Sequence, residues 1–225
     1  MKRNVMGFFA LPLAEKAALA QEPGEIEGYG QAFVISEEQT LDWADMFFLL
    51  TQPPSYRDLR LWPSNPSTSK NCLENYSAEV QRVAGELLRA MAENLGARDH
   101  SDMTRLAASQ AVRMNYCPPC PEAHVDRVLG LSPHSDAVAL TLLLQVLTNG
   151  KYKSVEHRAV VNAREQRMST AAFHGAKFGG TYGPLKEVVK EEEARYRSVS
   201  VEEYTKLMLS SKLDGKNIID AMKIK

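Results

Sequence analysis

Residues 134–158 read HSDAVALTLLLQVLTNGKYKSVEHR and place two histidines and a carboxylate at the ends of a short connection. On a β-strand, residues i and i+2 point to the same face, so the imidazole of His134 and the carboxylate of Asp136 would project together. A hydrogen-bonded surface pair has the same pattern, so these two residues alone do not identify a metal site. His157 adds a second imidazole on the next predicted strand, Val155 to Asn162. Two histidines and one carboxylate are the ligand set that binds non-haem Fe(II) with open coordination positions.

A second group of polar side chains lies on the strand that we predict over Arg167 to Phe173. Arg167 and Ser169 are again two positions apart, and Ala171 and Phe173 continue the same face. An arginine fork beside a serine hydroxyl suits bidentate binding of a carboxylate. The aromatic ring of Phe173 would then be placed to stack on a flat substrate. An ordinary ion pair and a core aromatic would account for each residue separately, so it is the order and spacing of the whole set that indicate a site.

The motifs around these residues identify a family. They are Asn115-Tyr116-Cys117-Pro118-Pro119-Cys120-Pro121, His134-Ser135-Asp136, residues 149–158 (NGKYKSVEHR) and Arg167-Met168-Ser169. Residues 28–30 (GYG) and 42–45 (DWAD) belong to the same pattern. Together they closely resemble plant 2-oxoglutarate- and Fe(II)-dependent dioxygenases of the anthocyanidin synthase, flavonol synthase and codeine O-demethylase type. The resemblance covers nearly the whole chain.

The resemblance implies an α+β fold with a double-stranded β-helix, or jelly-roll, core and flanking α-helices. It implies that His134, Asp136 and His157 hold Fe(II). It further implies that 2-oxoglutarate is bound by Arg167, Ser169 and Asn115, and that Phe173 and Phe33 line the substrate pocket. Ascorbate is a further cofactor of the kind that the resemblance suggests.

The reaction implied by the resemblance splits 2-oxoglutarate into succinate and carbon dioxide while a substrate is oxidised. The substrate would be a small plant specialised metabolite or hormone that is hydroxylated, desaturated or demethylated. The expected partners are this small molecule and molecular oxygen, with no nucleic acid and no membrane, and the chain is expected to be a monomer. The sequence does not identify the substrate.

Three regions follow from the pattern along the chain. Residues 1–105 would be a partial N-terminal region with helices, residues 106–182 the jelly-roll core, and residues 183–225 a C-terminal helical region. The clearest helix runs over Asn71 to Leu95, where an apolar stripe recurs at helical spacing. The apolar run Val138 to Val146 is compatible with a buried strand or with a short helix.

Three features depart from the family pattern. First, only 20 residues separate Asp136 from His157; on the order of thirty residues are absent near 146–147, which is several strands at about 5–6 residues each. Second, the chain begins at a helix that the family places well inside the protein, so we expect a missing N-terminal part. Third, Cys117 stands where the family has a tyrosine that contacts 2-oxoglutarate, and a thiol is a poorer hydrogen-bond donor. We therefore expect weaker cosubstrate binding, exposed strand edges and little or no turnover.

Two alternative functions remain open at this point. The first is a catalytically inactive shortened isoform that acts as a binding or regulatory protein, which the missing residues favour. The second is a zinc or redox site built from Cys117, Cys120 and His124, which lacks a fourth ligand.

Composition limits the class of protein further. The net charge of −1 arises from 27 basic and 28 acidic residues, which gives no indication of a nucleic-acid or anionic-membrane partner. An odd count of three cysteines is a poor disulfide framework and favours a reducing compartment, so we expect the cytoplasm. We expect no signal peptide.

Overall fold

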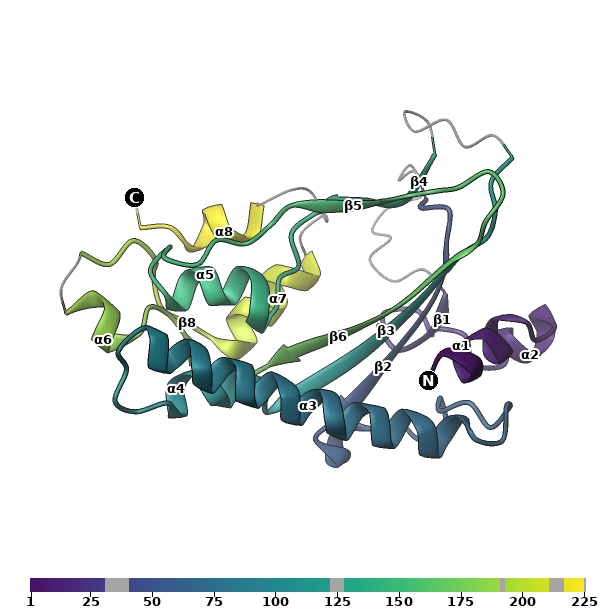
Figure 1. The fold of residues 1–225 in the computed structure, drawn as a ribbon, viewed down its shortest axis with the longest axis horizontal. Helices are drawn as coiled ribbons and strands as arrows, with labels where there is room; N and C mark the ends of the chain where they lie inside the picture. The colour runs from purple at the N-terminus through teal and green to yellow at the C-terminus, as the bar shows by residue number, and fades with distance from the viewer. Residues whose placement is uncertain (31–40, 122–127, 191–192, 211–216, 225) are drawn as a thin grey trace. The chain divides into compact units, whose positions relative to one another are not determined.

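The computed structural model describes residues 1–30, 41–121, 128–190, 193–210 and 217–224 (Figure 1). The chain forms two compact units. Unit 1 comprises Met1–Val80, Gln110–Ser132 and Arg158–Phe173. Unit 2 comprises Gln81–Ser109, Pro133–His157 and His174–Lys225. Each unit is assembled from three separated segments of sequence. Contacts between residues that are distant in the sequence therefore hold each unit together.

Unit 1 is built on a four-stranded sheet with the order β1-β2-β3-β6. Its strands are β1 (Gly28–Gly30), β2 (Asp45–Gln52), β3 (Ser109–Cys117) and β6 (Arg167–Gly175). β2 pairs antiparallel with both β1 and β3. Side chains alternate across the two faces of a sheet. One face of β2 and β3 therefore buries Phe47, Leu49, Val112 and Met114, whereas the other contributes to a smaller cluster with Met46, Phe48 and Ala111.

Helices at the start of the chain cover the larger of these two clusters. The sequence predicts a helix over Val5 to Ala20 that breaks or kinks at Pro12, and the structure confirms a break between α1 (Lys2–Phe9) and α2 (Leu13–Ala17). Proline has no N–H and cannot continue a helix interior. Phe8 of α1 stacks on Phe47 with the ring centroids 4.5 Å apart.

The turn that the sequence predicts over Gly24 to Gly30 is wrong in part, because its last three residues form strand β1. The backbone of Tyr29 pairs on its other side with the segment at Ala20, through Tyr29 N to Leu19 O (2.7 Å) and Gln21 N to Tyr29 O (2.9 Å). Gly28 has φ +117° and a Cβ there would lie 2.8 Å from the Gln21 nitrogen. The glycine therefore serves a close backbone approach rather than a turn.

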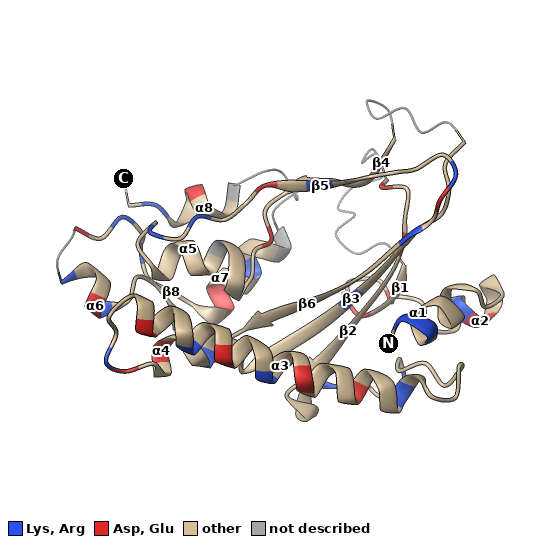
Figure 2. Cartoon of the chain, in the orientation of Figure 1, with Lys and Arg blue, Asp and Glu red and all other residues tan. Residues whose placement is uncertain are grey.

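The long helix predicted over Asn71 to Leu95 is confirmed as α3 (Ser69–Asn94). Acidic and basic residues are interspersed along it (Figure 2), with ion pairs four residues apart, Arg82–Glu86 and Arg89–Glu93. Pairs at this spacing lie on one face of a helix, and each stabilises the helix by about 0.2–0.5 kcal/mol. They make this face of α3 polar.

Unit 2 is mainly helical, and one apolar cluster forms its core. Its elements are α4 (Ser101–Thr104), the π-helix η3 (Ala139–Leu143), α5 (Leu144–Leu147), the β-strands β7 (Thr181–Tyr182) and β8 (Val199–Ser200), α6 (Lys186–Val189), α7 (Val201–Ser210) and α8 (Asn217–Met222). Ser200 caps α7, since its hydroxyl accepts a hydrogen bond from the Glu203 amide at 3.0 Å. Buried Leu88, Leu106, Leu147, Ile219 and Met222 contribute to the core.

The apolar run at Val138 to Val146 forms a helix, η3 followed by α5, and not a strand. The residues that follow contain a helix stop. Asn149 has φ +52°, the amide of Gly150 bonds to Gln145 O at 2.8 Å and that of Asn149 bonds to Val146 O at 3.1 Å. These two bonds form the Schellman pattern that ends helices. The signal Thr148-Asn149-Gly150 therefore helps to fix this run as helical.

The remaining strands, β4 (Leu129–His134) and β5 (His157–Val160), form a separate two-stranded sheet. Together with the four-stranded sheet of unit 1, this pair represents an incomplete jelly roll within an α+β fold, as the sequence predicts. A further pair, β7 and β8, is short and antiparallel. No helix among the described residues is long and apolar enough to cross a membrane.

Candidate functional site

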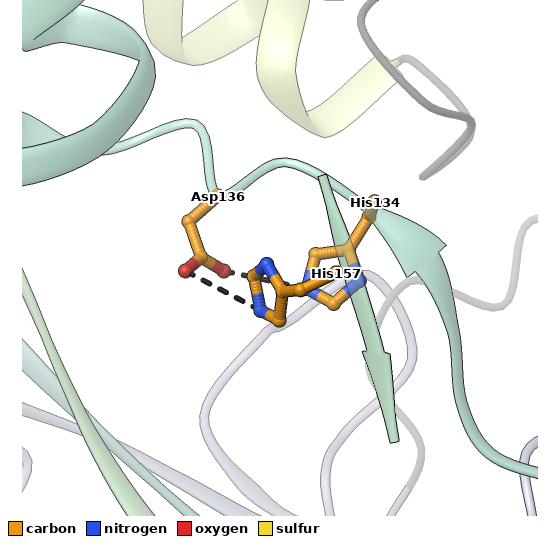
Figure 3. Close-up of side chains that lie close together, drawn as sticks. All are labelled: His134, Asp136 and His157. Atoms are coloured by element: carbon orange, nitrogen blue, oxygen red, sulfur yellow. Dashed lines mark ion pairs between the residues drawn. The ribbon is translucent and has the colours of Figure 1, made fainter. Parts of the chain in front are cut away.

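The two histidines and the aspartate predicted to hold a metal do converge (Figure 3). His134 is the last residue of β4, Asp136 lies two residues beyond it, and His157 is the first residue of β5. One ligand atom from each lies within 4.8 Å of the others. The Nε2 atom of His134 is 3.3 Å from Asp136 Oδ1, and Nε2 of His157 is 3.8 Å from Asp136 Oδ2. The two imidazole centroids are 4.5 Å apart.

These residues fit a divalent transition metal. At metal–ligand bonds of about 2.1 Å, ligands on one octahedral face lie about 3 Å apart, close to the separations seen. The exposure of the side chains falls from 45% at His157 and 25% at Asp136 to 5% at His134. The set is therefore anchored on a buried side and open on another, which leaves room for exogenous ligands.

The loop that carries Asp136 is held from two other elements of unit 2. The hydroxyl of Tyr204, on α7, donates to the carbonyl of Ala137 at 3.0 Å, and the hydroxyl of Thr141 in η3 donates to the carbonyl of Asp136. Burial raises the pKa of Tyr204, so its hydroxyl stays protonated and remains a donor. Sequence analysis did not identify Tyr204, because its place in the helical pattern of α7 is that of any core residue.

The residues predicted to bind the 2-oxoglutarate carboxylate also form a cluster, within unit 1. Arg167 Nη1 donates to Ser169 Oγ at 3.2 Å, and Asn115 Nδ2 donates to the same oxygen at 3.3 Å. The strands that carry them, β3 and β6, are neighbours in the sheet. Arg113 Nε donates to Asn115 Oδ1 at 2.7 Å and fixes which side of the amide is oxygen. Sequence analysis missed Arg113, although it alternates with Asn115 and Cys117 along β3.

Cys117 lies at the edge of this cluster. Its sulfur is buried and 3.9 Å from the carbonyl oxygen of Gly130. Burial raises the pKa of the thiol, and the nearby Arg167 guanidinium acts in the opposite direction. A raised thiol pKa keeps Cys117 protonated at neutral pH, as a weak donor. That this weakens cosubstrate binding stays a prediction.

Of the two phenylalanines predicted to line a substrate pocket, only one is described. The ring of Phe173 stacks near Phe48, with centroids 6.4 Å apart, and packs against the smaller apolar cluster of unit 1. Phe33 lies outside the described residues, and so does His124 of the alternative zinc or redox site. All three cysteines are free.

Family profiles match both parts of the sequence. The N-terminal profile, described as non-haem dioxygenase in morphine synthesis N-terminal, matches residues 1–65. The profile of the 2OG-Fe(II) oxygenase superfamily matches residues 108–146 and again 143–176. The chain thus matches this one profile in two pieces that overlap at residues 143–146. The sequence indicates a missing segment at the same place.

Curated plant proteins match the whole chain. The chain is 38% identical to 2-oxoglutarate-dependent dioxygenase 11 of Oryza sativa subsp. japonica, over 100% of this chain and 72% of that protein. It is 40% identical to S-norcoclaurine synthase 1 of Coptis japonica, over 100% and 73%. It is 34% identical to codeine O-demethylase of Papaver somniferum, over 100% and 72%. The alignment with the rice protein spans 259 residues, 34 more than the 225 of the chain, which is consistent with the internal shortening.

The fold comparison agrees with the sequences. The crystal structure of JOX2 in complex with 2OG, Fe and JA superposes with a TM-score of 0.91 at 26% identity, over 99% of this chain and 77% of JOX2. The family uses Fe(II) and 2-oxoglutarate, and the converged ligand set suits that iron. The chain belongs to the plant 2-oxoglutarate- and Fe(II)-dependent dioxygenases, a family of oxidoreductases.

Proposed function

We propose that His134, Asp136 and His157 hold Fe(II) and that Arg167, Ser169 and Asn115 bind the distal carboxylate of 2-oxoglutarate. The observation that carries the proposal is the convergence of the three ligand atoms within 4.8 Å. When bound, the iron supplies the activation of oxygen that the oxidation of an unreactive C–H bond needs.

The protein's own residues supply position and charge. The Asp136 carboxylate is the anionic ligand and offsets part of the charge of the ion, while the buried His134 ring gives the site a fixed edge. Both Arg167 and Asn115 donate to Ser169 Oγ, so the Ser169 hydroxyl proton can be directed at a carboxylate. Arg167 adds a forked, permanently charged donor, which suits a carboxylate better than a lysine would.

The substrate that we propose is a small plant specialised metabolite or hormone, which the chain would hydroxylate, desaturate or demethylate. The names of the relatives support this class, since they include codeine O-demethylase and an oxoglutarate-dependent flavonoid 7-O-demethylase of Ocimum basilicum. We propose that Phe173 and Phe33 contact it. Free cysteines support a place in the cytoplasm, and the regions 1–105, 106–182 and 183–225 remain our proposed division of the chain.

The test of this function is Fe(II)-dependent release of succinate from 2-oxoglutarate in air, at high protein concentration and over hours. We expect slow release by the 225-residue chain and at least about 100-fold less by Asp136→Ala, because an interaction worth roughly 3 kcal/mol is about that factor. Arg164→Ala, which alters an exposed arginine in the turn before β6, is the control and should release succinate like the unaltered chain.

The second candidate is an inactive isoform that binds a ligand or partner without turnover. The two-stranded β4–β5 sheet and the 34 unmatched alignment positions favour it. Succinate release that is equal in the chain and in Asp136→Ala, with both proteins folded, would establish this second candidate and reject the first.

A further inference from the structure

The connection from Asp136 to His157 must hold a metal-binding imidazole without the residues that relatives have there. Little apolar burial fixes its last part, since Val155 is 70% exposed and Glu156 and His157 are exposed as well. Hydrogen bonds from two polar side chains take this role. We infer that Gln145 and Ser135 are positioning residues that hold His157 within reach of the metal. This inference rests on the proposed iron site.

Gln145 joins the two sides of the shortened connection. Its Oε1 accepts hydrogen bonds from the Ser154 amide at 2.8 Å and from the Ser154 hydroxyl at 2.9 Å. A backbone amide can only donate, so it fixes the oxygen side of the Gln145 side chain. The nitrogen side, Nε2, contacts the hydroxyl of Tyr196 at 3.1 Å. The bonds of Gln145 therefore tie α5 to the segment that leads into β5.

The Gln145–Ser154 hydrogen bonds lie where the match to the family profile is divided into two pieces. Gln145 lies in the overlap of the two matched pieces, 108–146 and 143–176, and Ser154 lies within the second. The alignment with the rice relative is 34 positions longer than the 225-residue chain. The Gln145–Ser154 bonds thus close the connection at the place where the two matched pieces of the profile overlap.

Ser135 acts closer to the ring. Its hydroxyl donates to the carbonyl of Val155 at 3.2 Å, and that carbonyl oxygen lies 3.5 Å from His157 Nδ1. With Nδ1–H directed at the carbonyl, Nε2 is left as the metal-binding nitrogen, and this is the atom that lies 3.8 Å from Asp136. Ser135 therefore links the His134–Asp136 segment to the orientation of His157.

The test measures Co(II) affinity anaerobically through the visible absorption of the bound ion, and thermal unfolding of the metal-free protein. Gln145→Met keeps the length of the side chain and removes its acceptor, whereas Gln145→Glu keeps an acceptor for Ser154. Ser135→Ala removes the hydroxyl and Ser135→Thr keeps it. The matched controls lie in the same unit: Gln81→Met loses one bond to Ala107 O, and Ser109→Ala loses one bond of 3.2 Å to Ala176 O.

We expect Gln145→Met and Ser135→Ala to weaken Co(II) binding by about 10-fold or more, the range found when outer-shell partners of metal ligands are removed. Gln145→Glu and Ser135→Thr should restore most of the affinity. Ser109→Ala should lower the unfolding temperature about as much as Ser135→Ala does, since each loses one hydrogen bond, and both controls should leave Co(II) affinity unchanged. Affinity that stays within about twofold in both test variants would overturn the inference alone. A folded, unaltered chain that binds no Co(II) would overturn the proposed iron site together with it.

Discussion

At the residue scale, the cluster that we propose binds the cosubstrate, Arg167, Ser169 and Asn115, depends on few atoms. Ser169 Oγ accepts hydrogen bonds from the Arg167 guanidinium and from the Asn115 side-chain amide. The oxygen of that amide accepts a hydrogen bond from Arg113. An anion bound here would meet donors that already have their orientation. Such preorganisation lowers the cost of binding, because fewer side chains must be immobilised when the anion arrives.

We predict that Arg167→Ala raises the dissociation constant of 2-oxoglutarate at least about 30-fold, since hydrogen bonds from a charged group contribute roughly 1.5–3 kcal/mol each. Arg167→Lys should recover part of this loss, because it retains the charge and loses the fork. Calorimetry of 2-oxoglutarate binding to the Co(II)-loaded protein measures the effect. Unchanged binding in Arg167→Ala would reject the assignment of this cluster to the cosubstrate.

The sequence predicted the residues of both clusters through spacing and motif, but it did not predict their supports. His134 and Asp136 are two positions apart, and so are Arg167 and Ser169. On a strand this spacing puts both side chains of a pair on the same face, so the sequence alone predicts it. Tyr204 reaches Ala137 across 67 positions, and Gln145 reaches Ser154 around a helix end. Such contacts depend on how elements pack, and no local pattern encodes that.

At the element scale, the end of α5 determines how the chain turns toward β5. Asn149 has φ +52° and is 1% exposed, and its side chain donates to Glu193 O at 3.0 Å and accepts from Arg195 N at 2.8 Å. Asparagine tolerates the left-handed conformation better than other residues with a Cβ do. This position therefore combines a backbone requirement with two part-buried hydrogen bonds.

We predict that Asn149→Gly lowers the free energy of unfolding of the metal-free protein by about 1–3 kcal/mol, because two hydrogen bonds worth roughly 0.5–1.5 kcal/mol each are lost. Asn149→Ala should cost roughly 1 kcal/mol more, since alanine is strained at positive φ. Urea denaturation followed by circular dichroism measures both. Equal stability of Asn149→Ala and the unaltered chain would show that the helix stop does not contribute to the fold.

A pH-dependent contribution to stability arises where β2 meets the segment before β1. Burial raises the pKa of Glu27 above its ordinary value of 4.5, with repulsion from Asp58 and Glu25, while the Leu50 amide bonds to its carboxylate at 2.7 Å. An acid whose pKa is raised on folding stabilises the fold below its unfolded pKa. That contribution is lost as the pH rises through the folded pKa.

We therefore predict that Glu27→Gln is more stable than the unaltered chain at pH 7, and that its advantage shrinks as the pH falls toward 4.5. The amide oxygen of the variant can still accept from Leu50. Unfolding temperatures across this pH range, with the exposed Glu25→Gln as control, measure the difference. An advantage that grows at acid pH would contradict the direction of the pKa shift.

The sequence predicted regular elements well where period or punctuation is strong, as for α3 and β6. Residues Val138 to Val146 have no decisive period, because almost every position is apolar. Their helical form depends on the stop at Asn149 and Gly150 and on burial of Leu143, Val146 and Leu147 in the core of unit 2. The local helix stop and tertiary packing together decide such a case.

At the scale of the whole molecule, the proposed metal ligands converge although the β4–β5 sheet has two strands among the described residues. Val160, in β5, is 47% exposed, and Val155, two residues before β5, is 70% exposed. The 34 alignment positions without a counterpart correspond to roughly six strands' length at about 5–6 residues each, loops included. The exposure of these two side chains is expected for a sheet that lacks further strands.

We predict that a family-like segment inserted between Val146 and Leu147 stabilises the chain and raises its succinate release. Covering about 200 Å² of apolar surface contributes roughly 5 kcal/mol at about 25 cal/mol per Å², comparable with the stability of a typical domain. Binding of a hydrophobic dye should fall in parallel. A flexible glycine-serine insert of the same length is the control, and equal gains from both inserts would contradict the prediction.

The iron content of the anaerobically loaded and desalted 225-residue chain tests the central claim most directly. We predict about one Fe(II) per chain, and less than about a tenth of that in His157→Ala and in Asp136→Ala, because a facial triad that loses a ligand binds its metal far more weakly. Elemental analysis gives the content, and circular dichroism shows that each protein is folded. A folded chain that retains no iron, or a His157→Ala variant that retains all of it, would contradict the account.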